Sequence, residues 1–275
     1  MSDAKRLAGY VETWWQAVQD FVAVLEQVPD EQWTTPTDLA GWDVKAVAAH
    51  TAHLESRLAG EPEETADIGE PPHVTGLMGL YTEIGVVNRR DTPPSDIVAE
   101  IREVTRRRHE HLLADPPTDG RARPEVIFGG VPWTWELLLR NRPLDVWMHE
   151  QDVRRAVGLP GGMHSDAAQH TADYLIGSFG FIVAKKASAP VGTTAVLAVE
   201  GSPVLGFEVV TTDEGKARGQ LLPDVPDEAT VRLSMDRETF VVLAGGRRPA
   251  AAGAVTIEGD LELGTRIASV MATTP

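Results

Sequence analysis

The chain has 275 residues, of which 42% are hydrophobic, so it can form one large domain or two ordinary ones with substantial cores. Its 25 lysines and arginines face 41 aspartates and glutamates, and the net charge of −16 favours a small-molecule partner over nucleic acid or an anionic membrane. Because there is no cysteine, disulfides, cysteine ligands and cysteine nucleophiles are excluded, and any thiol chemistry must use a thiol from outside.

Targeting signals are not apparent in the sequence. No stretch reaches the roughly 18 consecutive apolar residues that a membrane span requires, and residues 1–6 lack the apolar segment of a signal peptide. We therefore expect a cytoplasmic protein without a membrane partner, present as a monomer or a homodimer.

The first part of the chain has the spacing of amphipathic helices. Apolar residues recur every three or four positions over residues 3–28, which predicts a long helix that Pro29 helps to end. Asp43 is a plausible N-cap for a second helix that runs to about Ala59. The acidic segment 60–72 that follows is typical of a solvated loop.

The helical pattern continues to about residue 157. Residues 76–90 are weakly helical, and a stronger helix begins at Pro94, with Ile97 and His111 among the residues expected inward. The arginines of this stronger helix are expected to point mostly outward, and they are Arg102, Arg106, Arg107 and Arg108.

The last helix of this half follows a long irregular connection over residues 115–132. It is predicted over residues 133–157, with Pro143 either kinking it or lying in its first turn after a short break. Four principal helices with long crossovers predict a four-helix bundle.

After residue 160 the pattern changes to mixed helix and strand. One helix is expected at 165–184, and further helices at 236–244 and 260–270. Strands are expected at 194–199, 204–210, 230–235 and 254–259. The fold class is therefore α+β: a bundle over residues 1–160, then a smaller α+β domain with a mostly antiparallel sheet over residues 161–275.

A possible metal site lies in the last bundle helix. Asp145 and His149 are four residues apart, so they share a helix face, and His50 on the second helix is the nearest candidate for a third ligand. Two imidazoles and a carboxylate suit a divalent metal, with zinc the default and nickel, manganese or iron possible. His53 competes with His50. An ordinary ion pair between acid and histidine is the alternative.

These residues lie in segments that resemble a known family. Segments 41–50, GWDVKAVAAH, and 145–158, DVWMHEQDVRRAVG, resemble the mycothiol-dependent maleylpyruvate isomerase family, a branch of the DinB-like metal-binding bundles. The resemblance extends to segments 240–248, FVVLAGGRR, and 255–264, VTIEGDLELG, which are similar to the family's second domain, akin to sterol carrier proteins.

The resemblance implies a zinc site and a thiol cosubstrate. The zinc ligands correspond to His50, Asp145 and His149, although the family usually has glutamate, one methylene longer, at the position of Asp145. The cosubstrate is mycothiol, a low-molecular-weight thiol of actinobacteria. Coordination by the metal favours the thiolate over a thiol of pKa about 8.5.

Two reaction types begin in this way. The thiolate can add to an activated double bond, allow rotation and leave, which is cis–trans isomerisation of the maleylpyruvate type, or the adduct can remain, which makes the protein an S-transferase. The partners would then be the thiol and a small electrophile. The alternative is a non-catalytic protein of the same fold that binds metal or a small ligand.

Arginines are the remaining candidates. The resemblance implies an arginine of the second domain that pairs with a substrate carboxylate, for which Arg247 is the first candidate and Arg248 the second. Asn88, Arg89 and Arg90 are weaker candidates for flanking the site and binding the cosubstrate.

Overall fold

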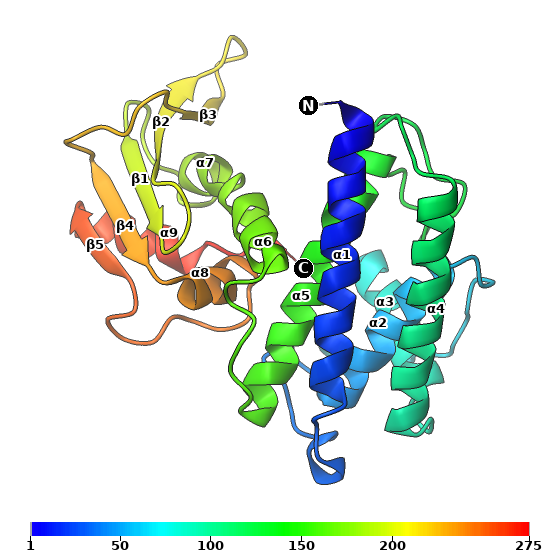
Figure 1. Cartoon of the computed structure of the whole chain (residues 1–275). Helices are drawn as coiled ribbons and strands as arrows, with labels where there is room; N and C mark the ends of the chain where they lie inside the picture. Colours follow the sequence, from blue (N-terminus) through cyan, green and yellow to red (C-terminus); the bar gives the residue numbers. More distant parts are fainter. Residues whose placement is uncertain (1, 275) are drawn as a thin grey trace. The chain divides into compact units, whose positions relative to one another are not determined.

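The chain forms two compact units. The computed structural model describes residues 2–274, and its first unit ends at Gly162 and its second begins at Met163. Residues 1 and 275, which the predicted domain ranges include, lie outside the described part. Figure 1 shows a helical unit in blue to green and a unit with a sheet in green to red.

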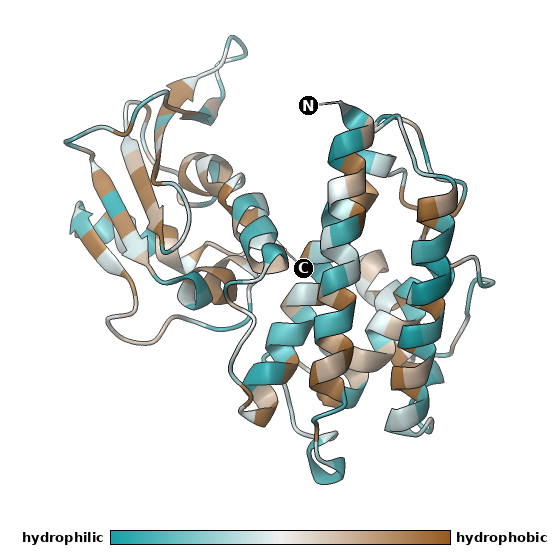
Figure 2. Cartoon of the chain, viewed as in Figure 1, coloured by the Kyte–Doolittle hydropathy of each residue, from teal (hydrophilic) through white to brown (hydrophobic). Residues whose placement is uncertain are grey.

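The first unit is a helical bundle. Its helices are α1 (Asp3–Leu25), α2 (Val44–Leu58), α3 (Gly76–Asn88), α4 (Pro94–Ala114) and α5 (Trp135–Val157), with a short 3-10 turn, η1 (Asp30–Gln32). Helix α1 packs against α4 and α5, and α2 packs against α3, α4 and α5. Apolar and polar residues alternate around these helices (Figure 2), so the apolar faces form the core and polar side chains remain outside. The four principal helices of the predicted bundle are thus present, and α3 adds a fifth.

Capping residues set where the bundle helices begin and end. The carboxylate of Asp43 accepts a hydrogen bond from the backbone N–H of Ala46 at 2.8 Å, which confirms the predicted N-cap. Thr134 caps α5 in the same way through Leu137. Gly158 ends α5 with a positive φ of 69°, a conformation that glycine adopts without steric cost.

Two details of the bundle differ from the sequence-based predictions. Helix α5 runs through Pro143, so there is no break before this residue. On α4, Arg108 is buried although it was expected outward, and His111 is exposed although it was expected inward. Arg108 is buried because Glu55 on α2 supplies a buried carboxylate, 2.7 Å away, for its guanidinium.

The acidic segment 60–72 is irregular, as expected, but it is not simply solvated. Three of its glutamates pair with basic residues of the bundle helices. These pairs are Glu61 with Arg107, Glu63 with Arg57, and Glu64 with Arg89. The negative charges therefore attach the segment to α2, α3 and α4.

The second unit is built on a five-stranded sheet with the order β3-β2-β1-β4-β5. Its strands are β1 (Thr194–Val199), β2 (Leu205–Thr211), β3 (Ala217–Leu221), β4 (Val231–Met235) and β5 (Thr256–Gly259). Only the β1–β4 pair is parallel among the described strands, which confirms a mostly antiparallel sheet. Strand β3 was not predicted.

Helices accompany the sheet. They are α6 (Asp166–Ile176), α7 (Phe179–Phe181), the π-helical segment η2 (Ile182–Lys186), α8 (Arg237–Ala244) and α9 (Leu261–Ser269). The single helix predicted over 165–184 is thus divided into three pieces. The division lies near Gly180, where a Cβ would be only 3.0 Å from the carbonyl oxygen of Gly219 on β3, so the helix backbone here touches the sheet edge.

Membrane-spanning helices were not expected. Within residues 2–274, no helix combines the length and the apolar character needed to cross a bilayer.

Candidate metal centre

The bundle brings together the three residues that the sequence predicted as ligands. Nε2 of His50 on α2 lies 3.9 Å from Oδ2 of Asp145 on α5, and Nε2 of His149 lies 3.8 Å from Oδ1 of the same carboxylate. One ligand atom from each residue fits within a group whose members are all within 4.8 Å of one another. Both histidines are buried, and Asp145 is partly exposed.

The environment sets the protonation of this group. Burial, with the nearby His149, lowers the pKa of His50 to about 3, so its imidazole is neutral at pH 7. Burial alone would raise the pKa of Asp145, but the charge of Arg142 lowers it well below its usual range. A neutral imidazole and an ionised carboxylate are the forms that bind a metal ion.

Aromatic contacts orient His50. The ring of Trp42 lies with its centroid 4.9 Å from that of His50, and His50 and His149 meet edge to face at 4.8 Å. Nδ1 of His50 is buried and has no hydrogen-bond partner within residues 2–274. The orientation of the His50 imidazole is therefore set by ring packing against Trp42 and His149.

His149 is oriented by a carboxylate instead. Its Nδ1 lies 3.2 Å from Oδ2 of the fully buried Asp152, whose other oxygen accepts a hydrogen bond from Arg155 at 2.6 Å. Arg155 in turn donates to Asp38 at 2.7 Å. With its proton on Nδ1, His149 presents an unprotonated Nε2 towards Asp145 and His50.

Asp145 contacts a buried arginine. Nη1 of Arg142 lies 2.9 Å from Oδ2 of Asp145, and the same guanidinium donates to Oε1 of Glu55 at 2.8 and 3.0 Å. Glu55 also accepts from Trp14 at 3.0 Å and from Arg108 at 2.7 Å. Four helices thus contribute to one buried charge cluster behind the candidate ligands.

The donor set fits a divalent metal ion. Tetrahedral nitrogen and oxygen ligands of zinc lie roughly 3.3–3.6 Å apart. Oδ1 of Asp145 lies 3.8 Å from Nε2 of His149, and one ligand atom from each of the three residues lies within 4.8 Å of the others, so side-chain rotations would bring the residues closer around an ion. The unpartnered Nδ1 of His50 does not compete, because Nε2 is the nitrogen that faces Asp145.

The other residues considered from the sequence have different surroundings. His53, the competitor of His50, is buried with Nδ1 3.4 Å from Oε1 of Glu64. Asn88 and Arg89 both donate to Glu64, and Arg89 also binds Glu100. The side chain of Arg90 is exposed, and its carbonyl oxygen accepts from Lys45 at 2.6 Å.

The two candidate arginines of the second unit follow α8. The guanidinium of Arg247 donates to the carbonyl oxygen of Gly245 at 2.8 Å, and its backbone N–H donates to Val242. Gly246 precedes Arg247 and has a positive φ of 67°, so the chain turns sharply just before the two arginines.

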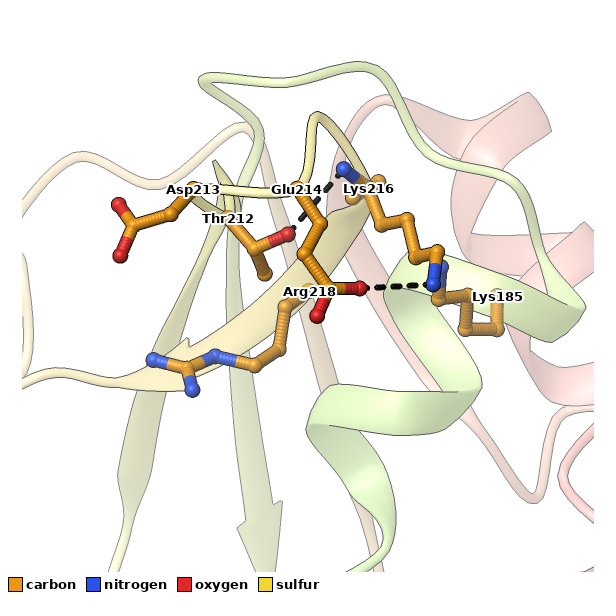
Figure 3. A pocket seen from close by; sticks show the side chains of 7 residues that line it. Lys185, Thr212, Asp213, Glu214, Lys216 and Arg218 are labelled. Carbon is orange, nitrogen blue, oxygen red and sulfur yellow. Dashed lines mark hydrogen bonds and ion pairs between the residues drawn. The ribbon is translucent and has the colours of Figure 1, made fainter.

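The second unit also contains an open pocket of about 360 Å³ at the turn between β2 and β3. It is lined by Lys185, Thr212, Asp213, Glu214, Lys216, Ala217 and Arg218. Figure 3 shows that Glu214 pairs with Lys216 across the turn, at 2.8 Å. The pocket contains both acidic and basic side chains, and its Glu214 and Lys216 are exposed and pair with each other. It therefore has no predominant charge that would indicate a charged ligand.

Sequence reasoning missed the residues that support the ligands. Asp152 is three residues after His149, and Arg142 is three residues before Asp145, so helical spacing could have indicated both. Glu55 has no such local signal, because only the packing of α2 against α5 brings it to Arg142.

The fold and the site define a class: a helical bundle in which two histidines and one carboxylate form a candidate metal site, followed by an α+β unit. Residues 14–154 match the model of the mycothiol maleylpyruvate isomerase N-terminal domain, and residues 169–266 match that of the corresponding C-terminal domain. The chain belongs to the mycothiol maleylpyruvate isomerase family, which is an enzyme family.

Individual relatives are more distant. The chain is 25% identical over 146 residues to two uncharacterized proteins of Mycobacterium tuberculosis, from strains CDC 1551 and H37Rv, and this covers 51% of the chain. The match spans about half the length of these curated relatives, 53%.

Solved structures share the fold over nearly the whole chain. A crystal structure of the mycothiol-dependent maleylpyruvate isomerase matches with a TM-score of 0.54 and 16% identity, and covers 94% of this chain and 96% of that one. A histidine-to-alanine mutant of that enzyme matches with a TM-score of 0.52. At this identity the likeness supports the fold.

Proposed function

We propose that the protein is a zinc- and mycothiol-dependent enzyme that adds a thiol to a small electrophile. The observation that carries the proposal is the convergence of His50, Asp145 and His149 from two helices onto one group of ligand atoms. The family supports it, because its name specifies mycothiol and an isomerisation. The absence of cysteine is consistent with a thiol that comes from outside the chain.

The three residues would hold the metal ion, which can be zinc or another divalent cation. When bound there, the ion supplies a Lewis acid that favours the ionised form of a coordinating thiol at neutral pH. Asp152 holds the proton of His149 at Nδ1, away from the ligand group. The ring of Trp42 packs beside His50, with its centroid 4.9 Å from that of the imidazole.

Substrate binding would use the arginines. Arg247 and Arg248 are our candidates for pairing with a substrate carboxylate, because a guanidinium binds a carboxylate through two parallel hydrogen bonds. Arg90, with an exposed side chain, is the most available of the three weaker candidates for binding the thiol, since Asn88 and Arg89 already donate to glutamates.

Metal content and turnover test this function together. The purified chain should contain about one metal ion per molecule, and His50→Ala and His149→Ala should each reduce this content strongly. With mycothiol and a panel of electrophiles that includes maleylpyruvate, mass spectrometry should detect either an isomerised product or a thiol adduct. The isomerised product identifies an isomerase, and the adduct identifies an S-transferase.

Two results would contradict the proposal. A metal content that does not respond to His50→Ala or His149→Ala would show that the ligand assignment is wrong. Metal bound at these residues without turnover across the panel would favour a non-catalytic binding protein of the same fold.

A further inference from the structure

Arg142 links the candidate metal centre to the buried charges behind it. Its side chain is fully buried and forms ion pairs with two carboxylates, those of Glu55 and Asp145. Nη1 lies 2.9 Å from Oδ2 of Asp145, while Nε and Nη2 donate to Oε1 of Glu55 at 3.0 and 2.8 Å. The planar guanidinium can serve both carboxylates at once, which the ammonium group of a lysine cannot do with the same geometry.

We propose that Arg142 is a positioning residue that makes Asp145 a ligand through one oxygen only. This inference rests on the proposed function, because it concerns the same three ligands. Arg142 engages Oδ2, whereas Oδ1 faces Nε2 of His149 at 3.8 Å. Oδ1 is therefore the oxygen that remains for a metal ion.

The position of Arg142 is fixed from behind. Glu55 is fully buried and is itself held by hydrogen bonds from Trp14 on α1 and Arg108 on α4. The guanidinium of Arg108 also lies over the ring of Trp14, 4.6 Å from its centroid. Since moving Arg142 would leave the buried Glu55 short of a partner, its place beside Asp145 is strongly determined.

This arrangement has an electrostatic consequence for the open positions of the metal. Arg142 balances the single negative charge of the ligand set, because the other two ligands are imidazoles. A divalent ion held by such a set would keep most of its positive charge, and it would therefore favour an anion such as a thiolate as its next ligand. A carboxylate bound through both oxygens would instead fill a further position.

Cobalt provides the test, because its visible absorption reports the number of ligands. We would load the full-length chain with Co²⁺ and titrate it with 2-mercaptoethanol as the probe thiol. Arg142→Gln should weaken the visible absorption, as Asp145 becomes free to bind through both oxygens. It should also lower the affinity for the probe thiol about tenfold, which corresponds to about 1.4 kcal/mol.

The matched control is Arg108→Gln. Arg108 donates to the other oxygen of Glu55 and is equally buried, but it pairs with Glu55 and not with Asp145. This variant should lose stability, yet keep the Co²⁺ spectrum and the thiol affinity of the parent chain. If Arg142→Gln does not fold, its combination with Glu55→Gln and Arg108→Gln removes the three buried charges behind Asp145 together and carries the same test.

The outcomes separate this inference from the proposed function. A Co²⁺-loaded chain in which Arg142→Gln changes neither the spectrum nor the thiol affinity would overturn the inference alone. Equal changes in Arg108→Gln would also overturn it, because they would show a general effect of destabilisation. A parent chain that takes up no Co²⁺ would overturn the proposed function as well.

Discussion

The two candidate ligands on α5 receive opposite kinds of support. His149 has a carboxylate behind it, Asp152, whereas Asp145 has a guanidinium beside it, Arg142. The carboxylate makes the imidazole a stronger donor, and the guanidinium makes the carboxylate a weaker one. The strength of metal binding should therefore depend on residues that do not touch the ion.

Asp152→Asn should test the support of His149. An amide of the same shape can no longer hold the imidazole proton at Nδ1 by charge, so we expect metal affinity to fall about 10- to 100-fold with the fold retained. Competition with a chelator measures the affinity. Glu150→Gln is the control, because Glu150 is a buried neighbour on α5 that pairs with Arg154; an equal loss there would contradict the role of Asp152.

At this scale the sequence predicted the ligands better than their surroundings. His50, Asp145 and His149 follow from helical spacing and from the motifs around them, and the structure brings them together. The charge cluster at Glu55 was not predicted, because an ion pair between helices depends on how the helices pack. For the same reason Arg108 was assigned to the surface.

At the scale of elements, contacts between α7 and β3 depend on two glycines. A Cβ on Gly219 would be 2.2 Å from the carbonyl oxygen of Gly180, a backbone atom that cannot easily move away. The local sequence of residues 165–184 is helical, but the segment is divided into α6, α7 and η2, and Gly180 in α7 makes this contact with a residue far away in sequence. Strand β3 escaped prediction because Ala217–Leu221 is short and has no buried residue, so it lacks a clear apolar pattern.

Gly219→Ala should destabilise the protein. The added methyl group forces β3 and α7 apart, and overpacking of this kind costs about 1–3 kcal/mol. Urea unfolding measures the change. Gly9→Ala on α1 is the contrasting case, since nothing lies within 4 Å of its Cβ, and it should raise stability by about 0.5–1 kcal/mol. Equal effects of the two substitutions would refute the close contact.

The attached acidic segment predicts a pH dependence. Burial alone would raise the pKa of Glu64, but hydrogen bonds from His53, Arg89 and Asn88 lower it well below the ordinary 4.5. The folded pKa is thus below the unfolded one. This carboxylate stabilises the fold above about pH 4.5, and the contribution is lost as the pH falls below that value.

Glu64→Gln tests this dependence. It should lower the free energy of unfolding at pH 7, and it should then lose less than the parent chain when the pH is reduced from 7 to 4. Denaturant unfolding at both pH values gives the difference, with the exposed Glu31→Gln as control. If Glu64→Gln loses as much on acidification as the parent chain, the ion pairs do not hold the segment.

At the scale of the whole molecule, the candidate metal centre belongs to one unit. All three ligands lie within residues 1–162, so metal should stabilise that unit and leave residues 163–275 unaffected. Calorimetry of the metal-loaded chain should show that a chelator lowers one unfolding transition only. A ligand at a hundred times its dissociation constant contributes about 2.7 kcal/mol.

The control for this measurement is His149→Ala, whose transitions should not respond to the chelator. A chelator that moves both transitions of the parent chain would show that the units unfold together.

The family could be predicted from the sequence because its motifs occur in both halves of the chain. The contact between Gly180 and Gly219 could not be predicted, since it joins residues far apart in sequence.

The buried cluster of Glu55, Arg108 and Arg142 also constrains how this protein can evolve. The three residues come from α2, α4 and α5, and each is buried, so the loss of one would leave a buried charge without its partner. Such a loss costs about 3–5 kcal/mol, whereas replacing all the charges with apolar residues can be neutral. Lineages should therefore keep the three positions together or exchange them together, and the positions should covary among descendants of a common ancestor.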